Sequence, residues 1–141
     1  MKILRSVVCT LGLLLAVSAA RAQSVPVSAN VPFDFIVGKQ VFPAGNYLLS
    51  PGNSTGEAVI IRNTDESTYS SITVTQSCFK SSPAEKTALM FHRVGNLYFL
   101  EQVWVEGWQS GRQFRKSPIE TQMARNHNDR DEIIVAALIT H

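Results

Sequence analysis

Short apolar runs separated by turn residues dominate the chain between residues 31 and 107. The runs are about five to nine residues long, and Gly, Pro, Asn and Ser lie between them, a spacing typical of antiparallel β proteins. Residues 57–62 are apolar on both faces, so we expect this strand to lie inside a sheet rather than at its edge. The full pattern predicts six strands. The first runs over residues 31–37 and resumes at 40–42 after a turn, and the others are at residues 46–50, 57–62, 70–79, 86–94 and 97–105.

Gly95 and Asn96 give the clearest turn signal, because a two-residue connection with glycine first favours a type II′ β-hairpin. Such a turn fixes the register of the strands on either side of it. Large apolar groups occupy both faces of this hairpin, so we expect a second sheet on one side and a helix or another chain on the other. The expected opposite pairs are Val94 and Leu97, His92 and Phe99, Phe91 and Leu100, and Thr87 and Trp104.

The C-terminal part of the chain contains a helix signal followed by a final apolar run. Ser117-Pro-Ile-Glu120 is a capping box with proline at the first helical position, which predicts a helix from Pro118 to about Asn126. Residues 132–139 favour a last buried strand, with a helix as the alternative because their alternation is poor. The expected fold is mainly β, an antiparallel β-sandwich or open barrel of about seven strands with one short helix near the C-terminus.

The first residues resemble a secretory signal peptide. Lys2 and Arg5 precede an apolar run at residues 7–17, and Ala20-Arg-Ala22 supplies the small residues of a cleavage site before Gln23. The apolar run is far shorter than the ~20 residues that span a bilayer, so we expect cleavage and no transmembrane segment in the mature chain. The sequence therefore predicts a signal peptide at residues 1–22, a single β-rich domain at residues 23–141, and a secreted or periplasmic protein.

Charge and cysteine content change this picture in two ways. The formal net charge of +2 includes Lys2, Arg5 and Arg21, so the mature chain has a formal charge of −1, and we expect no nucleic-acid partner. Cys9 leaves with the signal peptide, so Cys78 cannot form an internal disulfide. Cys78 shares a predicted strand face with Ile72 and Val74, which favours a buried and inert thiol.

One acid/base pair follows from the hairpin register, in which His92 and Glu101 are diagonal neighbours on one face. An imidazole beside a carboxylate can act as a general base, so these two residues are the catalytic candidates. No G-x-S-x-G elbow or other placed nucleophile accompanies them, which favours a structural role. His127 and His141 do not stand at metal-ligand spacing from His92, so we expect no metal and no cofactor.

A glycine-bounded stretch at residues 107–111 is the candidate binding surface. It contains Trp108 and is followed by Arg112 and Arg115, residue types that suit a sugar ring or a partner protein. The alternative is that Trp108 folds back beside Trp104 as a lid on the core.

Several segments together resemble a known family. They are Val31-Pro-Phe-Asp-Phe-Ile-Val-Gly38, Phe42-Pro-Ala-Gly-Asn-Tyr47, Gly95-Asn-Leu-Tyr-Phe-Leu100, Trp104, Gly111-Arg112 and Ser117 to Glu120. The likeness covers nearly the whole mature chain and is to a family of short, uncharacterised secreted β-rich proteins common in soil acidobacteria. It implies a bacterial envelope or extracellular location and supplies no known activity or catalytic residues.

These observations favour a non-catalytic secreted or periplasmic envelope or binding module. Its partner would be an envelope component, a polysaccharide or a protein, and a homo-oligomer is an open alternative. Two other functions stay open: a small secreted hydrolase that uses His92 with Glu101, and a barrel that binds an apolar ligand.

Overall fold

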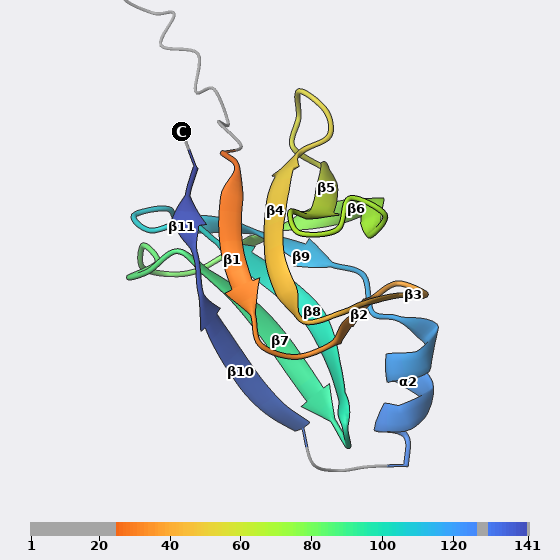
Figure 1. The fold of residues 1–141 in the computed structure, drawn as a ribbon. Helices are drawn as coiled ribbons and strands as arrows, with labels where there is room; N and C mark the ends of the chain where they lie inside the picture. The colour runs from red at the N-terminus through yellow and green to blue at the C-terminus, as the bar shows by residue number, and fades with distance from the viewer. Residues whose placement is uncertain (1–24, 127–129, 141) are drawn as a thin grey trace, which may run out of the picture.

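The computed structural model describes residues 25–126 and 130–140, and Figure 1 shows their arrangement. The predicted signal peptide and its cleavage site lie outside these residues. The described part of the chain forms eleven strands and one helix. They are β1 (Val27–Val31), β2 (Phe35–Val37), β3 (Gln40–Phe42), β4 (Gly45–Pro51), β5 (Ala58–Asn63), β6 (Ser70–Phe79), β7 (Ala88–Val94), β8 (Leu97–Trp104), β9 (Ser110–Phe114), α2 (Pro118–Ala124), β10 (Arg130–Ala136) and β11 (Leu138–Ile139).

The strands form one mixed sheet in the order β10-β7-β8-β9-β6-β5-β4-β1-β11. β3 pairs with β2, and β2 joins β8 in parallel through Ile36 and Phe99. The expectation of a mainly β fold with an open sheet and one short helix is confirmed. The expectation of about seven strands that are all antiparallel is wrong.

Three local features account for the larger number of strands. The predicted strand at residues 31–37 divides at Pro32, which has no N–H for the ladder, and its first part already begins at Val27. The predicted binding stretch at residues 107–111 runs into β9, which has little apolar alternation but pairs with β6 on one side and β8 on the other. The final run is strand rather than helix, and Ala137 divides it into β10 and β11. The expectation that this strand is buried is wrong, because Ile134 and Leu138 are 64% and 73% exposed.

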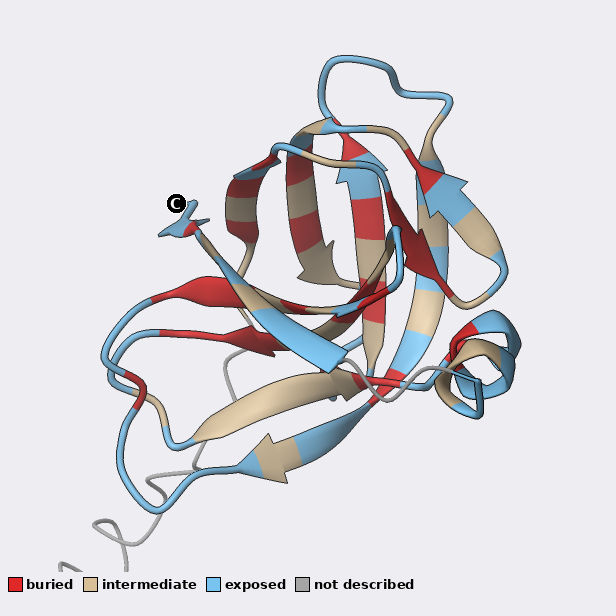
Figure 2. Ribbon diagram, turned by 90° about the horizontal axis from the view of Figure 1, so that it is seen from below, coloured by how far each residue is buried: buried red, intermediate tan, exposed pale blue. Residues whose placement is uncertain are grey.

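The sheet curls around a common interior, and its two ends meet in the C-terminal segment. β10 pairs with β7 and β11 pairs with β1, although Ala137 alone separates them. Figure 2 shows buried positions alternating with more exposed ones along several strands that surround this interior. The inward positions form the main core, which includes Val27, Val31, Phe35, Phe42, Tyr47, Leu49, Val59, Ile61, Leu89, Phe91, Leu100 and Phe114.

The β7–β8 hairpin confirms most of the predicted register. Gly95 has a φ of 60° and no non-glycine residue among those described has a positive φ, as a type II′ turn requires. The expected pairs next to the turn are all present. A bulge then shifts the ladder, because Phe91 faces Leu100 while Met90 faces Gln102. Trp104 therefore lies opposite Ala88 instead of Thr87, which corrects the predicted pair.

Helix α2 covers the outer face of this hairpin, as the apolar residues on both faces predicted. Ser117 is the N-cap, and its Oγ accepts a hydrogen bond of 3.2 Å from the Ile119 N–H. The helix ends at Ala124, two residues before the predicted end. Met123 packs with Leu97 against a second buried cluster formed by Ile36, Val94 and Phe99.

Strand β6 presents the opposite face to the one expected. Ile72 and Val74 are 68% and 53% exposed, whereas Thr75 is buried. The neighbouring strand explains this: Val59 and Ile61 of β5 fill the core, and their partners on β6 are Thr73 and Ser71. β5 is an interior strand, as predicted, but its position turns the apolar face of β6 outward.

Cys78 shares a face with Ile72 and Val74, as predicted, but the prediction that this face buries the thiol is wrong. Cys78 lies on the outward face of β6 and is half-buried. Its partial burial still raises the pKa of the thiol, while a hydrogen bond from the Gly111 backbone and the charge of Lys80 oppose that shift.

Candidate functional site

An apolar pocket opens between the inner faces of β1, β4 and β5 on one side and β8 and β9 on the other. It has a volume of about 80 Å³. Two of the three predicted binding residues, Trp108 and Arg112, line it. Most of the remaining wall is aliphatic and includes Val25, Val27, Leu49, Val59, Val103 and Val105.

Trp108 is half-buried and packs against the main core. Its backbone is fixed on both sides, because its N–H donates to the Val105 carbonyl at 3.1 Å and its carbonyl accepts from the Ala84 N–H at 2.9 Å. The side chain therefore lies over the core, but it also forms part of the pocket wall. The two alternatives for Trp108, packing and binding, are both compatible with this position.

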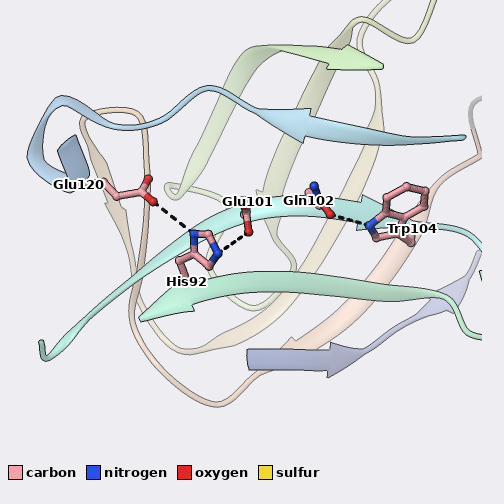
Figure 3. A network of polar contacts seen from close by, with 5 residues as sticks. All are labelled: His92, Glu101, Gln102, Trp104 and Glu120. Atoms are coloured by element: carbon pink, nitrogen blue, oxygen red, sulfur yellow. Dashed lines mark hydrogen bonds and ion pairs between the residues drawn. The ribbon is translucent and has the colours of Figure 1, made fainter. Parts of the chain in front are cut away.

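Trp104 does not lie beside Trp108 as the packing alternative supposed. It faces outward from β8 and is 3% exposed, with the Lys80 Nζ 4.2 Å from its ring centroid. Its indole N–H donates to the Gln102 Oε1 at 2.9 Å, as Figure 3 shows. Trp104 thus belongs to the outer face of the sheet, whereas Trp108 belongs to the inner face.

Arg112 is held in place by two hydrogen bonds. Its Nη1 donates to the Ser77 Oγ at 3.1 Å, and its Nη2 donates to the Thr55 carbonyl at 3.0 Å. Arg112 lies on β9 rather than in a flexible loop, so its backbone is fixed as well. Arg115 is exposed and does not line the pocket. The structure therefore joins Trp108 with Arg112 and leaves Arg115 apart.

The acid/base candidates also lie together. The His92 Nε2 is 2.9 Å from the Glu101 Oε2, as the hairpin register predicted. The bulge assists this contact because Glu101 is the extra residue of β8. A third residue, Glu120 of α2, places its Oε1 3.5 Å from the His92 Nδ1, so the imidazole lies between two carboxylates (Figure 3).

Glu120 was missed by the sequence reasoning, which assigned its side chain to the helix cap. The capping box gave the correct N-cap, Ser117, but Glu120 is buried and faces the sheet instead. The available signal was the spacing of Glu120 and Met123, which puts both on the helix face that covers the hairpin.

The histidine cluster is better suited to holding α2 on the sheet than to general-base catalysis. Burial raises the pKa of Glu101; the charge of His92 opposes this shift, and Glu120 and Glu132 add to it. Both ring nitrogens of His92 face carboxylates, and only the doubly protonated ring has an N–H for each of them. The Nδ1 is buried without a hydrogen bond within the described residues. Neither nitrogen is therefore directed at a substrate site.

The described part of the chain contains no group of three His, Cys, Asp or Glu side chains that could hold a metal ion. His127 and His141 lie outside the described residues. No helix between residues 25 and 126 or 130 and 140 has the length and apolar character needed to cross a bilayer.

Comparison of the chain with family models, with curated proteins and with solved structures found no match. The resemblance to secreted acidobacterial proteins therefore stays a prediction.

Proposed function

We propose that this protein is a non-catalytic secreted or periplasmic binding module that holds an apolar group of its ligand in the pocket under Trp108. The observation that carries the proposal is the joining of Trp108 and Arg112 with aliphatic residues from distant strands in one concave site. Ligand sites are typically concave and mostly apolar, with a small number of polar groups that fix orientation. This site has that composition.

The pocket agrees with parts of two of the hypotheses made from the sequence. It contains Trp108 and Arg112, which were two of the three predicted binding residues, and it lies inside a curved sheet, where an apolar ligand was the alternative. A polysaccharide is a weaker candidate because a sugar ring stacks on an open indole face, and Trp108 is packed against the core.

The hydrolase alternative has one observation in its favour, the 2.9 Å contact between His92 and Glu101. A general base needs a ring nitrogen within reach of the proton that it removes. The second nitrogen of His92 faces Glu120, so we favour a structural role for this cluster.

Titration with a neutral apolar probe tests the binding proposal. In a Trp104→Phe background, the emission of Trp108 should change saturably with n-pentanol. Val25→Phe, at the pocket wall, should weaken this binding by about tenfold or more because the added ring occupies the site. Val41→Phe is the matched control, since Val41 is 56% exposed on β3 and away from the pocket. The absence of saturable binding, or equal binding by both variants, would contradict the proposal.

A further inference from the structure

We propose that the ligand of this pocket is a small free aliphatic carboxylate. Its alkyl end would lie against the valines beneath Trp108, and its carboxylate would pair with the Arg112 guanidinium. This inference rests on the proposed function and adds the chemical class of the ligand. Three observations carry it: the size of the pocket, the composition of its wall, and the unused donors of Arg112.

The size of the pocket limits the enclosed part of the ligand. Its volume of about 80 Å³ is roughly half that of an apolar cavity of about 150 Å³ known to hold benzene. At about 30 Å³ for each water-sized group, the pocket has room for about three methyl or methylene groups. A short alkyl chain fits this space, whereas an aromatic ring or a long acyl chain would extend beyond it.

The wall of the pocket is mostly aliphatic and includes one hydroxyl side chain, that of Ser50. Its aliphatic side chains come from four separate segments, and they include Val27, Leu49 and Val103, which are also part of the main core. A hydroxyl or amide placed among them would lose its hydrogen bonds to water without replacement. The enclosed end of the ligand is therefore an alkyl group.

Arg112 sets the charge of the other end. A guanidinium has five N–H donors, and hydrogen bonds to Ser77 and Thr55 use two of the donors of Arg112. Those two bonds fix the planar group of a residue that lines the pocket, which lowers the entropy lost when a ligand binds. Among the residues that the structure describes, no ion pair involves Arg112. Carboxylates and phosphates both bind a guanidinium in a two-pronged geometry, and the carboxylate is the smaller of the two; an amine would be repelled.

Matched ligand series test this inference on the exported protein carrying Trp104→Phe. We would titrate n-alkanoates, n-alcohols and n-alkylamines of three to eight carbons at pH 7, following Trp108 emission and confirming affinities by calorimetry. Carboxylates should bind about tenfold or more tightly than alcohols of equal length, and amines should bind least. Affinity should rise about fourfold for each added methylene until about three carbons are enclosed, and then level off.

Two variants and one pH series assign the preference to Arg112. Arg112→Gln should lower the ratio of carboxylate affinity to alcohol affinity to about one, and Arg115→Gln, at the exposed neighbour, should leave that ratio unchanged. If Arg112→Gln does not fold, the pH series on the Trp104→Phe protein decides instead. The carboxylate advantage should then disappear as the ligand becomes protonated near pH 4.

The outcomes separate this inference from the proposed function. Alcohols that bind as tightly as carboxylates would overturn the inference and leave the apolar site intact. Failure of every alkyl compound to bind would overturn both. A preference that persists in folded Arg112→Gln would show that another group recognises the anion.

Discussion

Replacing His92 with alanine removes the imidazole that lies between the carboxylates of Glu101 and Glu120. The lost 2.9 Å contact joins side chains that are 19% and 18% exposed. A surface ion pair contributes about 0 to 1 kcal/mol to stability and a buried charged hydrogen bond about 1.5 to 3 kcal/mol, and the contribution of this contact should fall between the two. Repulsion between the two remaining carboxylates adds to the loss. We expect the free energy of unfolding to fall by about 1 to 3 kcal/mol at pH 7, and the melting temperature by about 4 °C for each kcal/mol.

The sign of the pH dependence follows from Glu101. Its pKa in the folded protein is raised, mainly by burial, so its protonated form is favoured in the folded state. Such a group contributes stability that is fully present below its unfolded pKa and is lost as the pH rises through its folded pKa. Because His92 is the largest influence that lowers this pKa, His92→Ala should raise it further. The deficit of the variant should therefore be smaller at about pH 4, where Glu101 is mostly protonated, than at pH 7.

Urea unfolding at several pH values, followed by circular dichroism, measures this effect. His92→Ala combined with Glu101→Gln should recover part of the stability at pH 7, since the double variant no longer holds an unpaired carboxylate there. Arg93→Ala is the matched control, because Arg93 is the next residue of β7 and its ion pair with Asp131 is exposed. A deficit as large at about pH 4 as at pH 7, or no deficit at all, would refute this role. Loss of turnover of an ester, glycoside or peptide at unchanged melting temperature would favour the hydrolase instead.

Three further expectations concern the N-terminus, the thiol and the pocket wall. N-terminal sequencing of exported protein should give Gln23 as the first residue, and a retained leader in membranes would contradict the predicted cleavage. Cys78 should react with iodoacetamide in the native state, but more slowly than in urea. Because burial raises the pKa of the thiol, the alkylation rate of the native protein should rise at a higher pH than that of the unfolded protein. Complete protection of the native thiol would disagree with its half-buried position. Trp108→Ala should lower the free energy of unfolding by about 1 to 3 kcal/mol, less than for a fully buried tryptophan, and full quenching of Trp108 emission with an unchanged melting temperature would count against packing.

The β7–β8 turn, the N-cap of α2 and the strand register next to the turn could be predicted from the sequence, because each depends on residues that are close along the chain. Gly95 with Asn96 determined the pairing next to the turn, and Ser117 with Pro118 determined the helix start, because each signal acts within a few residues. The contact between His92 and Glu101 followed from that pairing. The bulge after Leu100 was not predictable, since it depends on how β8 fits against β7 and β9 together.

Features that depend on neighbouring strands could not be predicted in the same way. The alternation of β6 indicates the wrong face, because apolar Ile72 and Val74 lie on the outward face while Thr73 and Thr75 lie on the inward one. Which face turns inward is decided by the space that β5 leaves in the core. The pocket has the same origin, because its wall comes from strands that are distant in the sequence.

Gly111 has a different structural role from the one that the sequence predicts. In the sequence it bounded a flexible stretch, but in β9 it lies flat against β8, where an added Cβ would be 2.7 Å from the Val103 carbonyl oxygen and 2.8 Å from the ring of Trp104. Glycine is needed here for close packing rather than for a turn. Because side chains alternate along a strand, the outward position of Gly111 beneath Trp104 turns Arg112 inward. The packing of one tryptophan on the outer face thus fixes the residue that we assign to ligand recognition on the inner face.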